Sequence, residues 1–175
     1  MFDRRKIGGL GVSSLLALTV AGCGFQPVYK GGPRGGTVPQ MAAISVAPID
    51  DRLGQVVRNH LLDLLTPKGA PARPLYRLEV KLRETKDGLA LEQDESVTRF
   101  NLTLHAAFEM NDLRTDRKIL EGATRAIAAY NVVRSDYANL IAERDARSRS
   151  SKEVAQEIKA RIAVYFRRQE QAALR

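Results

Sequence analysis

Residues that supply chemistry are scarce in this chain of 175 residues, which has one cysteine, two histidines and no tryptophan. One cysteine cannot form an intramolecular disulfide, so the chain must fold by packing alone. His60 and His105 lack a metal-ligand spacing, and carboxylate pairs such as Asp50-Asp51 fall in predicted turns, where they serve local hydrogen bonds. The absence of tryptophan disfavours a base-stacking platform. We therefore expect neither a metal site nor an enzyme.

Long apolar runs are also missing, because residues 7–21 are too short and too rich in Gly and Ser for a membrane-spanning helix. Basic residues at positions 4–6 precede this run, which ends in the small Ala21 and is followed by Gly22, directly before Cys23. That order is typical of a secretory signal, which predicts a signal peptide at residues 1–22. The run Val20-Ala21-Gly22-Cys23 resembles the lipobox of bacterial lipoproteins. The resemblance implies a diacylglycerol and an N-acyl lipid on Cys23; a free thiol or an intermolecular bridge is the alternative.

Acidic residues are outnumbered, and the formal net charge is +8. The predicted signal peptide carries three basic residues and Asp3, so the mature chain would keep +6. An exported protein meets no genomic DNA, which excludes nucleic acid and leaves lipid phosphates, anionic glycolipids or acidic proteins as partners. Solubility alone also explains such a charge. Gly24 stands where an Asp would signal inner-membrane retention, so we expect a lipid-anchored, periplasm-facing protein of the outer membrane.

The rest of the chain divides into a tether and one domain. Residues 23–41 are rich in Gly and Pro, which predicts a flexible tether. Residues 42–175 are enough for one hydrophobic core. Their patterning predicts strands near residues 44–48, 76–82, 98–110 and 118–130, a helix at 53–65, and a helical tail from residue 136.

The tail has two possible starts, at a Ser135 cap and at a capping box of Ser150 and Glu153. Whether residues 144–151 break the helix stays open. The predicted fold class is α+β. It is a two-layer sandwich in which two helices cover one face of a four-stranded, mainly antiparallel sheet in the order β-α-β-β-β-α. Alternation leaves the polar face free and unusually basic, with Arg77, Lys81, Arg83, Arg99, His105 and Arg125.

Four short passages stand out along the mature chain. They are the run Cys23-Gly24-Phe25-Gln26-Pro27-Val28-Tyr29, the helix passage Arg58-Asn59-His60-Leu61, the strand Tyr76-Arg77-Leu78-Glu79-Val80 and the stretch from Ala129-Tyr130-Asn131 to Ser135-Asp136-Tyr137-Ala138. Together they resemble the LptE family of lipopolysaccharide-assembly lipoproteins. The resemblance covers nearly the whole mature chain. It implies a non-enzymatic lipoprotein that plugs the LptD outer-membrane β-barrel, helps it to assemble and contacts lipopolysaccharide.

Basic residues near the turn between the second and third predicted strands are our candidates for the lipopolysaccharide contacts. They are Arg83, Lys86 and Arg99. Two other functions stay open. An auxiliary lipoprotein of an ABC-type lipid transporter would share the anchor and the fold class, whereas a lipid-anchored hydrolase would need a nucleophile constellation that the sequence lacks.

Overall fold

The computed structural model describes residues 37–91 and 97–174. The predicted signal peptide and Cys23 lie outside these residues. The described part begins with a short helix, α2 (Thr37–Met41), whose Met41 is buried in the core. This helix lies within residues 23–41, the segment predicted as a tether.

A four-stranded sheet forms the centre of the fold, in the order β1-β2-β3-β4. The strands are β1 (Ile44–Val46), β2 (Tyr76–Leu91), β3 (Val97–Asp112) and β4 (Arg117–Asn131). The short β1 pairs parallel to β2, and the other pairs are antiparallel. The α+β class and the mainly antiparallel four-stranded sheet are confirmed, and β2 runs nine residues beyond its predicted end at residue 82.

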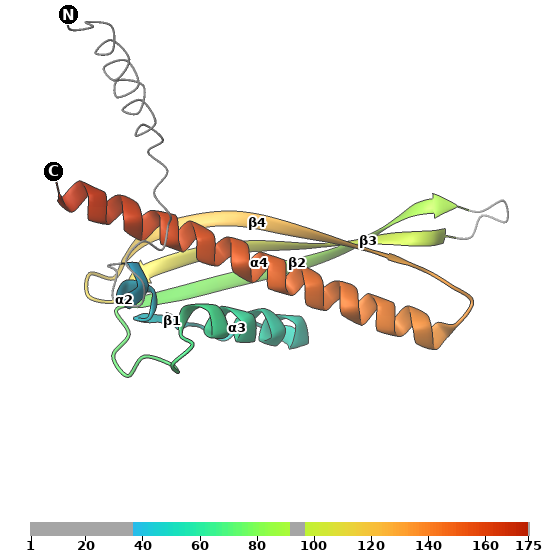
Figure 1. Cartoon of the computed structure of the whole chain (residues 1–175), viewed down its shortest axis with the longest axis horizontal. Coiled ribbons are helices and arrows are strands. Elements are labelled where there is room, and N and C mark those ends of the chain that lie inside the picture. Colours follow the sequence, from blue (N-terminus) through green and yellow to red (C-terminus); the bar gives the residue numbers. More distant parts are fainter. Residues whose placement is uncertain (1–36, 92–96, 175) are drawn as a thin grey trace, which may run out of the picture.

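Two helices complete the domain. The first, α3 (Asp51–Leu65), lies at the β1 side of the sheet, and α4 (Asp136–Ala173) crosses the face of β3 and β4 as one unbroken helix of 38 residues (Figure 1). The predicted cap is confirmed, because the Ser135 hydroxyl accepts a hydrogen bond from the Ala138 N–H at 3.4 Å. No new helix begins at Ser150, the second possible start. Ser150 and Ser151 are buried within α4 and donate hydrogen bonds to the Arg147 carbonyl.

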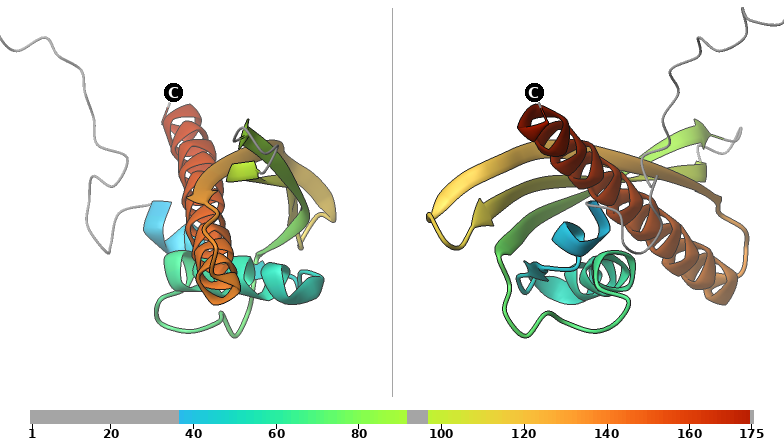
Figure 2. Two further views of the ribbon diagram at one scale, coloured as in Figure 1. Left: turned by 90° about the vertical axis from the view of Figure 1, so that its right-hand side faces the viewer. Right: turned by 60° about the vertical axis from the view of Figure 1, so that its left-hand side comes forward.

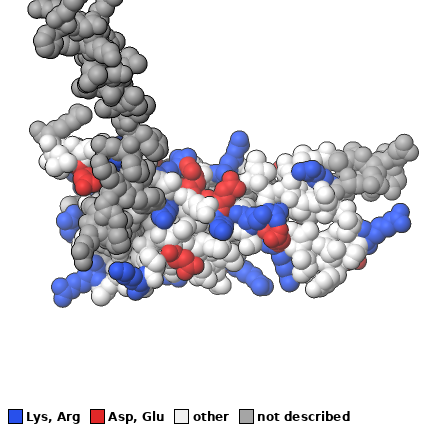
Figure 3. Space-filling model, in the orientation of Figure 1, with Lys and Arg blue, Asp and Glu red and all other residues white. Residues whose placement is uncertain are grey.

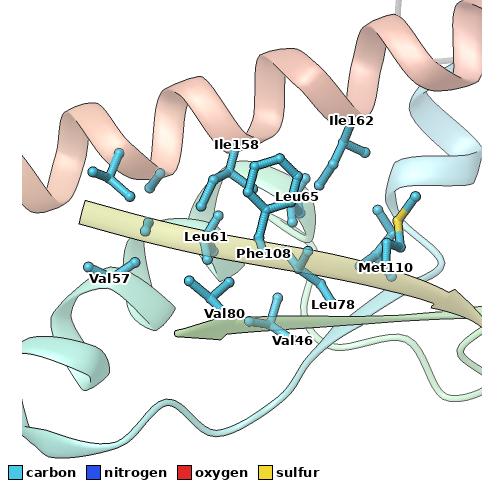
Figure 4. Packing of buried hydrophobic residues seen from close by; sticks show 14 of the residues in the cluster. Val46, Val57, Leu61, Leu65, Leu78, Val80, Phe108, Met110, Ile158 and Ile162 are labelled. Atoms are coloured by element: carbon cyan, nitrogen blue, oxygen red, sulfur yellow. The ribbon is translucent and has the colours of Figure 1, made fainter. Parts of the chain in front are cut away.

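The hydrophobic core lies between this helical layer and the inner face of the sheet. Leu78 and Val80 of β2 and Phe108 and Met110 of β3 point toward the helices, as their alternation predicts (Figure 4). The helices supply the opposite side of the core with Val57, Leu61, Leu65, Val154, Ile158, Ile162 and Phe166.

One glycine is required for this packing. Phe108 lies opposite Gly122 on β4, and a Cβ atom at Gly122 would lie 2.8 Å from the Phe108 ring. The missing side chain therefore makes room for the Phe108 ring on the inner face.

The other face of the sheet, here called the outer face, carries no helix from residues 37–91 or 97–174 (Figure 2). The two-layer arrangement thus leaves the polar side of three long strands available to a ligand or a partner.

Candidate binding surface

Strand register sorts the charges of the outer face into rows that run across β2, β3 and β4. Because each row contains residues directly opposite one another, their side chains stand about 5 Å apart at Cβ. The successive rows are Glu79, Glu109 and Glu121; then Lys81, Ala107 and Ala123; then Arg83, His105 and Arg125.

The glutamate row is balanced by neighbouring cations. The Arg77 guanidinium lies 3.0 Å from the Glu79 carboxylate, and the Lys118 ammonium pairs with Glu121 and lies 4.0 Å from Glu109. The hydrogen bond from Lys118 lowers the pKa of Glu121 below its ordinary value. An open hollow of about 400 Å³ lies over this row, where the small Ala107 leaves space.

The basic row has no such balance. Arg83 and Arg125 are exposed, His105 is half-buried between them, and among the described residues none of the three has an ion-pair partner. A second hollow, of about 410 Å³, lies beside the row and is lined by His105, Arg125 and Arg161 of α4. Clustered guanidinium groups at an open surface suit an anion with several oxygens, since each can donate two parallel hydrogen bonds.

The three residues predicted to contact lipopolysaccharide fall on two different faces. Arg83 lies on the outer face, within the basic row. Arg99 is exposed on the same face, nearer the β2–β3 turn, where it stands opposite Asn131. Lys86 lies on the inner face, because it shares the parity of Leu78 and Val80 along β2.

Lys86 belongs to a polar cluster beneath the first turns of α4. Its ammonium lies 2.9 Å from Glu143 Oε2 and 4.5 Å from the centre of the Phe100 ring. The Tyr130 hydroxyl donates to the same carboxylate oxygen at 3.2 Å. Hydrogen bonds with Tyr130 and Glu143 raise the pKa of Lys86, and the one from Lys86 lowers the pKa of Glu143.

Arg147 extends this cluster along α4. Its guanidinium makes a forked contact with the Glu84 carboxylate, with N···O distances of 2.9 Å for Nε and for Nη2, and pairs with Glu143 at 2.6 Å. Hydrogen bonding to Glu84 raises the pKa of Arg147. The charges of Lys86 and Arg147 are therefore used within the domain, to hold α4 on the sheet.

His105 and Arg125 are the two residues of the basic row that were not chosen as contacts from the sequence, although both were placed on the polar face. Their alignment with Arg83 follows from the pairing of β2 with β3 and of β3 with β4. Alternation along each strand shows from the sequence which face a residue is on, but it does not show which residues of neighbouring strands lie opposite one another.

The chain is similar to several other bacterial proteins in sequence or in fold. No family model matches the chain. An uncharacterized protein of Rickettsia prowazekii, RP188, is 23% identical over 152 residues, which cover 87% of this chain and 94% of that protein. At this identity the relative indicates a similar chain but assigns no activity.

Three solved structures share the fold. A protein of Caulobacter crescentus described as a lipoprotein superposes with a TM-score of 0.63 at 20% identity, over 75% of this chain and 96% of that one. A minor lipoprotein of Acinetobacter baumannii gives 0.54 at 20% identity, over 69% and 91%. An uncharacterized lipoprotein B of Nitrosomonas europaea gives 0.54 at 13% identity, over 70% and 81%. The fold is therefore one that bacterial lipoproteins use.

Membrane-spanning helices and metal sites are both absent from the described residues. No helix within residues 37–91 and 97–174 has the length and the apolar composition needed to cross a bilayer. In the same residues, no three His, Cys, Asp or Glu side chains gather in a way that could hold a metal ion.

Proposed function

We propose that this chain is an outer-membrane lipoprotein, anchored by the acylated Cys23 and facing the periplasm. Its partner is an LptD-like β-barrel, which it plugs and helps to assemble, and it assists the insertion of lipopolysaccharide into the outer leaflet. The proposal combines the sequence resemblance to the LptE family with a fold that lipoproteins share.

The observation that carries the proposal is the basic row on an uncovered sheet face. Arg83 and Arg125 flank His105 with no carboxylate to neutralise them among the described residues, so this row offers its charge to an external anion. Lipopolysaccharide carries phosphate groups, whose oxygens match the forked donors of arginine.

The polar outer face also fits the proposed barrel. The lumen of a wide transmembrane barrel is polar, so a plug needs a polar surface that is not consumed by its own fold. The balanced glutamate row and the basic row provide hydrogen-bond donors and acceptors over adjacent parts of one face. An apolar sheet face would be unsuited to that environment.

The test is affinity purification of the tagged full chain from membranes, followed by identification of the co-purifying protein. We expect a large outer-membrane barrel, and we expect the Cys23→Ser variant to be lost from the outer-membrane fraction. Co-purification of an ATPase complex instead would replace this proposal with the ABC-transporter alternative. Mass spectrometry of the mature amino terminus checks the acyl groups separately.

A further inference from the structure

The large apolar side chains in the first turns of α4 face away from the sheet, although a helix packed on a core usually turns such side chains toward it. Tyr137, Leu140 and Ile141 are 74%, 46% and 43% exposed. The side chains turned toward the sheet in this part of the helix are small or charged, as with Ala146 and Arg147. Only the small Ala142 and Ala146 pack on apolar residues of the sheet here, and the larger apolar side chains of these turns form a stripe that faces outward.

The connection from β4 extends this stripe. Val133 is 53% exposed, and the Asn139 side chain fixes it beside the helix. Asn139 Oδ1 accepts from the Val133 N–H and Nδ2 donates to the Val133 carbonyl, both at 2.8 Å. We call Val133, Tyr137, Leu140 and Ile141 the α4 apolar patch. Because this clamp holds both segments, the patch is one preformed surface.

The charges around the patch are mainly basic. Among the described residues, neither Arg134 nor Arg144 has an ion-pair partner, and both are exposed. The nearby carboxylates are Asp136, in the first turn of α4, and Asp145, which pairs with Arg149. Figure 3 shows the surface over the start of α4 as largely uncharged, with basic side chains along its margin.

We propose that the α4 apolar patch binds an anionic lipid surface. Aliphatic side chains beside a tyrosine suit the boundary between acyl chains and headgroups, where the phenol hydroxyl keeps its contact with water. Arg134 and Arg144 can reach lipid phosphates while their methylene groups lie along the apolar surface. The attraction of anionic headgroups to each basic residue is additional to the burial of the patch.

This site is separate from the basic row, and its existence does not rest on the barrel proposal. The basic row lies on the outer face, whereas the patch lies on the side of α4 that points away from the sheet. A polar lumen or an isolated phosphate would leave the patch without a partner. An interface with another protein remains the competing occupant, and the test distinguishes it.

A fluorescent reporter on the full chain tests the proposal. An environment-sensitive label is attached to Ser148→Cys, an exposed position on the patch side of α4, in a Cys23→Ser background with no other thiol. The probes are vesicles of phosphatidylglycerol with phosphatidylcholine, and vesicles of phosphatidylcholine alone. We expect a blue shift on the anionic vesicles only, and none for a label at Gln156→Cys, farther along α4.

Matched variants assign the effect to the patch. Tyr137→Ser with Ile141→Ser should raise the lipid concentration for half-maximal shift about tenfold, since two apolar side chains that the lipid would bury are lost. Val164→Ser is the control, because Val164 is 40% exposed on the same helix but outside the patch. An unchanged label on anionic vesicles that carry the bound chain overturns the proposal. Protection of the label only in a complex with a protein also overturns it.

Discussion

The two halves of α4 attach to the same sheet by different means. From Val154 to Phe166 the helix buries aliphatic and aromatic side chains in the main core, and its charged residues face outward. From Asp136 to Arg149 it approaches the sheet through Glu143, Arg147 and the small Ala142 and Ala146, and its larger apolar residues face outward. Hydrophobic burial therefore fixes one half, while hydrogen bonds and ion pairs orient the other half and leave its apolar side for a ligand.

The largest effect is expected from the half that is packed on the core. Ile158 is fully buried, so Ile158→Ala should lower the free energy of unfolding by about 2–4 kcal/mol through lost burial and a residual cavity. Urea denaturation followed by circular dichroism measures the change. Val164→Ala on the same half should cost less than about 0.5 kcal/mol. Similar losses for both variants would contradict hydrophobic attachment of this half.

A smaller effect is expected from the polar half. Arg147→Ala removes the forked contact to Glu84 and the pairing with Glu143, which should cost about 1–2 kcal/mol because the partly buried Glu84 loses its donor, while Glu143 keeps Lys86 and Tyr130. The same denaturation experiment applies. Arg161→Ala, which breaks an exposed pair with Glu157 one turn away, should change stability by at most about 0.5 kcal/mol. Equal effects would mean that Arg147 does not fix the helix.

The stability contributed by the polar half of α4 should also depend on pH, through Glu143. Lys86 lowers the pKa of Glu143 below its ordinary value of 4.5, so the carboxylate stabilises the fold above that pH and the stabilisation is lost as the pH falls through the lowered pKa. Glu143→Gln should therefore be less stable than the native chain by about 1 kcal/mol at neutral pH. The gap should narrow as the pH falls from 4.5 through the lowered pKa, as measured by denaturation over a pH series. A gap that widens toward acid would contradict this role for Glu143.

Much of the fold could be predicted from local patterns. Alternation along β2 and β3 gave the strands and their buried faces, and the apolar spacing of α3 gave its helix within two residues of its observed start. The continuity of α4 could not be predicted, because Ser150 and Ser151 look like a helix start. Buried within the helix, their hydroxyls bond to the Arg147 carbonyl and leave no break.

The candidate site was predicted less completely. Parity along β2 already placed Lys86 with Leu78 and Val80 on the covered face, but nearness to the turn favoured it as a ligand contact. The alignment of Arg83 with His105 and Arg125 depends on which residues pair across three strands. Register arises from the packing of the whole sheet, so the pattern of a single strand does not contain it.

The proposed function depends on the binding of lipopolysaccharide by the basic row of the uncovered sheet face. The most direct measurement is the affinity of the purified full chain for lipopolysaccharide, with Arg83→Glu/Arg125→Glu compared with Lys86→Gln. A second double variant, Arg52→Glu/Arg73→Glu, makes the same change in net charge at exposed positions outside the sheet. We expect at least about a tenfold loss of affinity for the row variant and less than about a twofold change for the other two. Unchanged binding by a folded row variant, or a larger loss in Lys86→Gln, would contradict the proposed function.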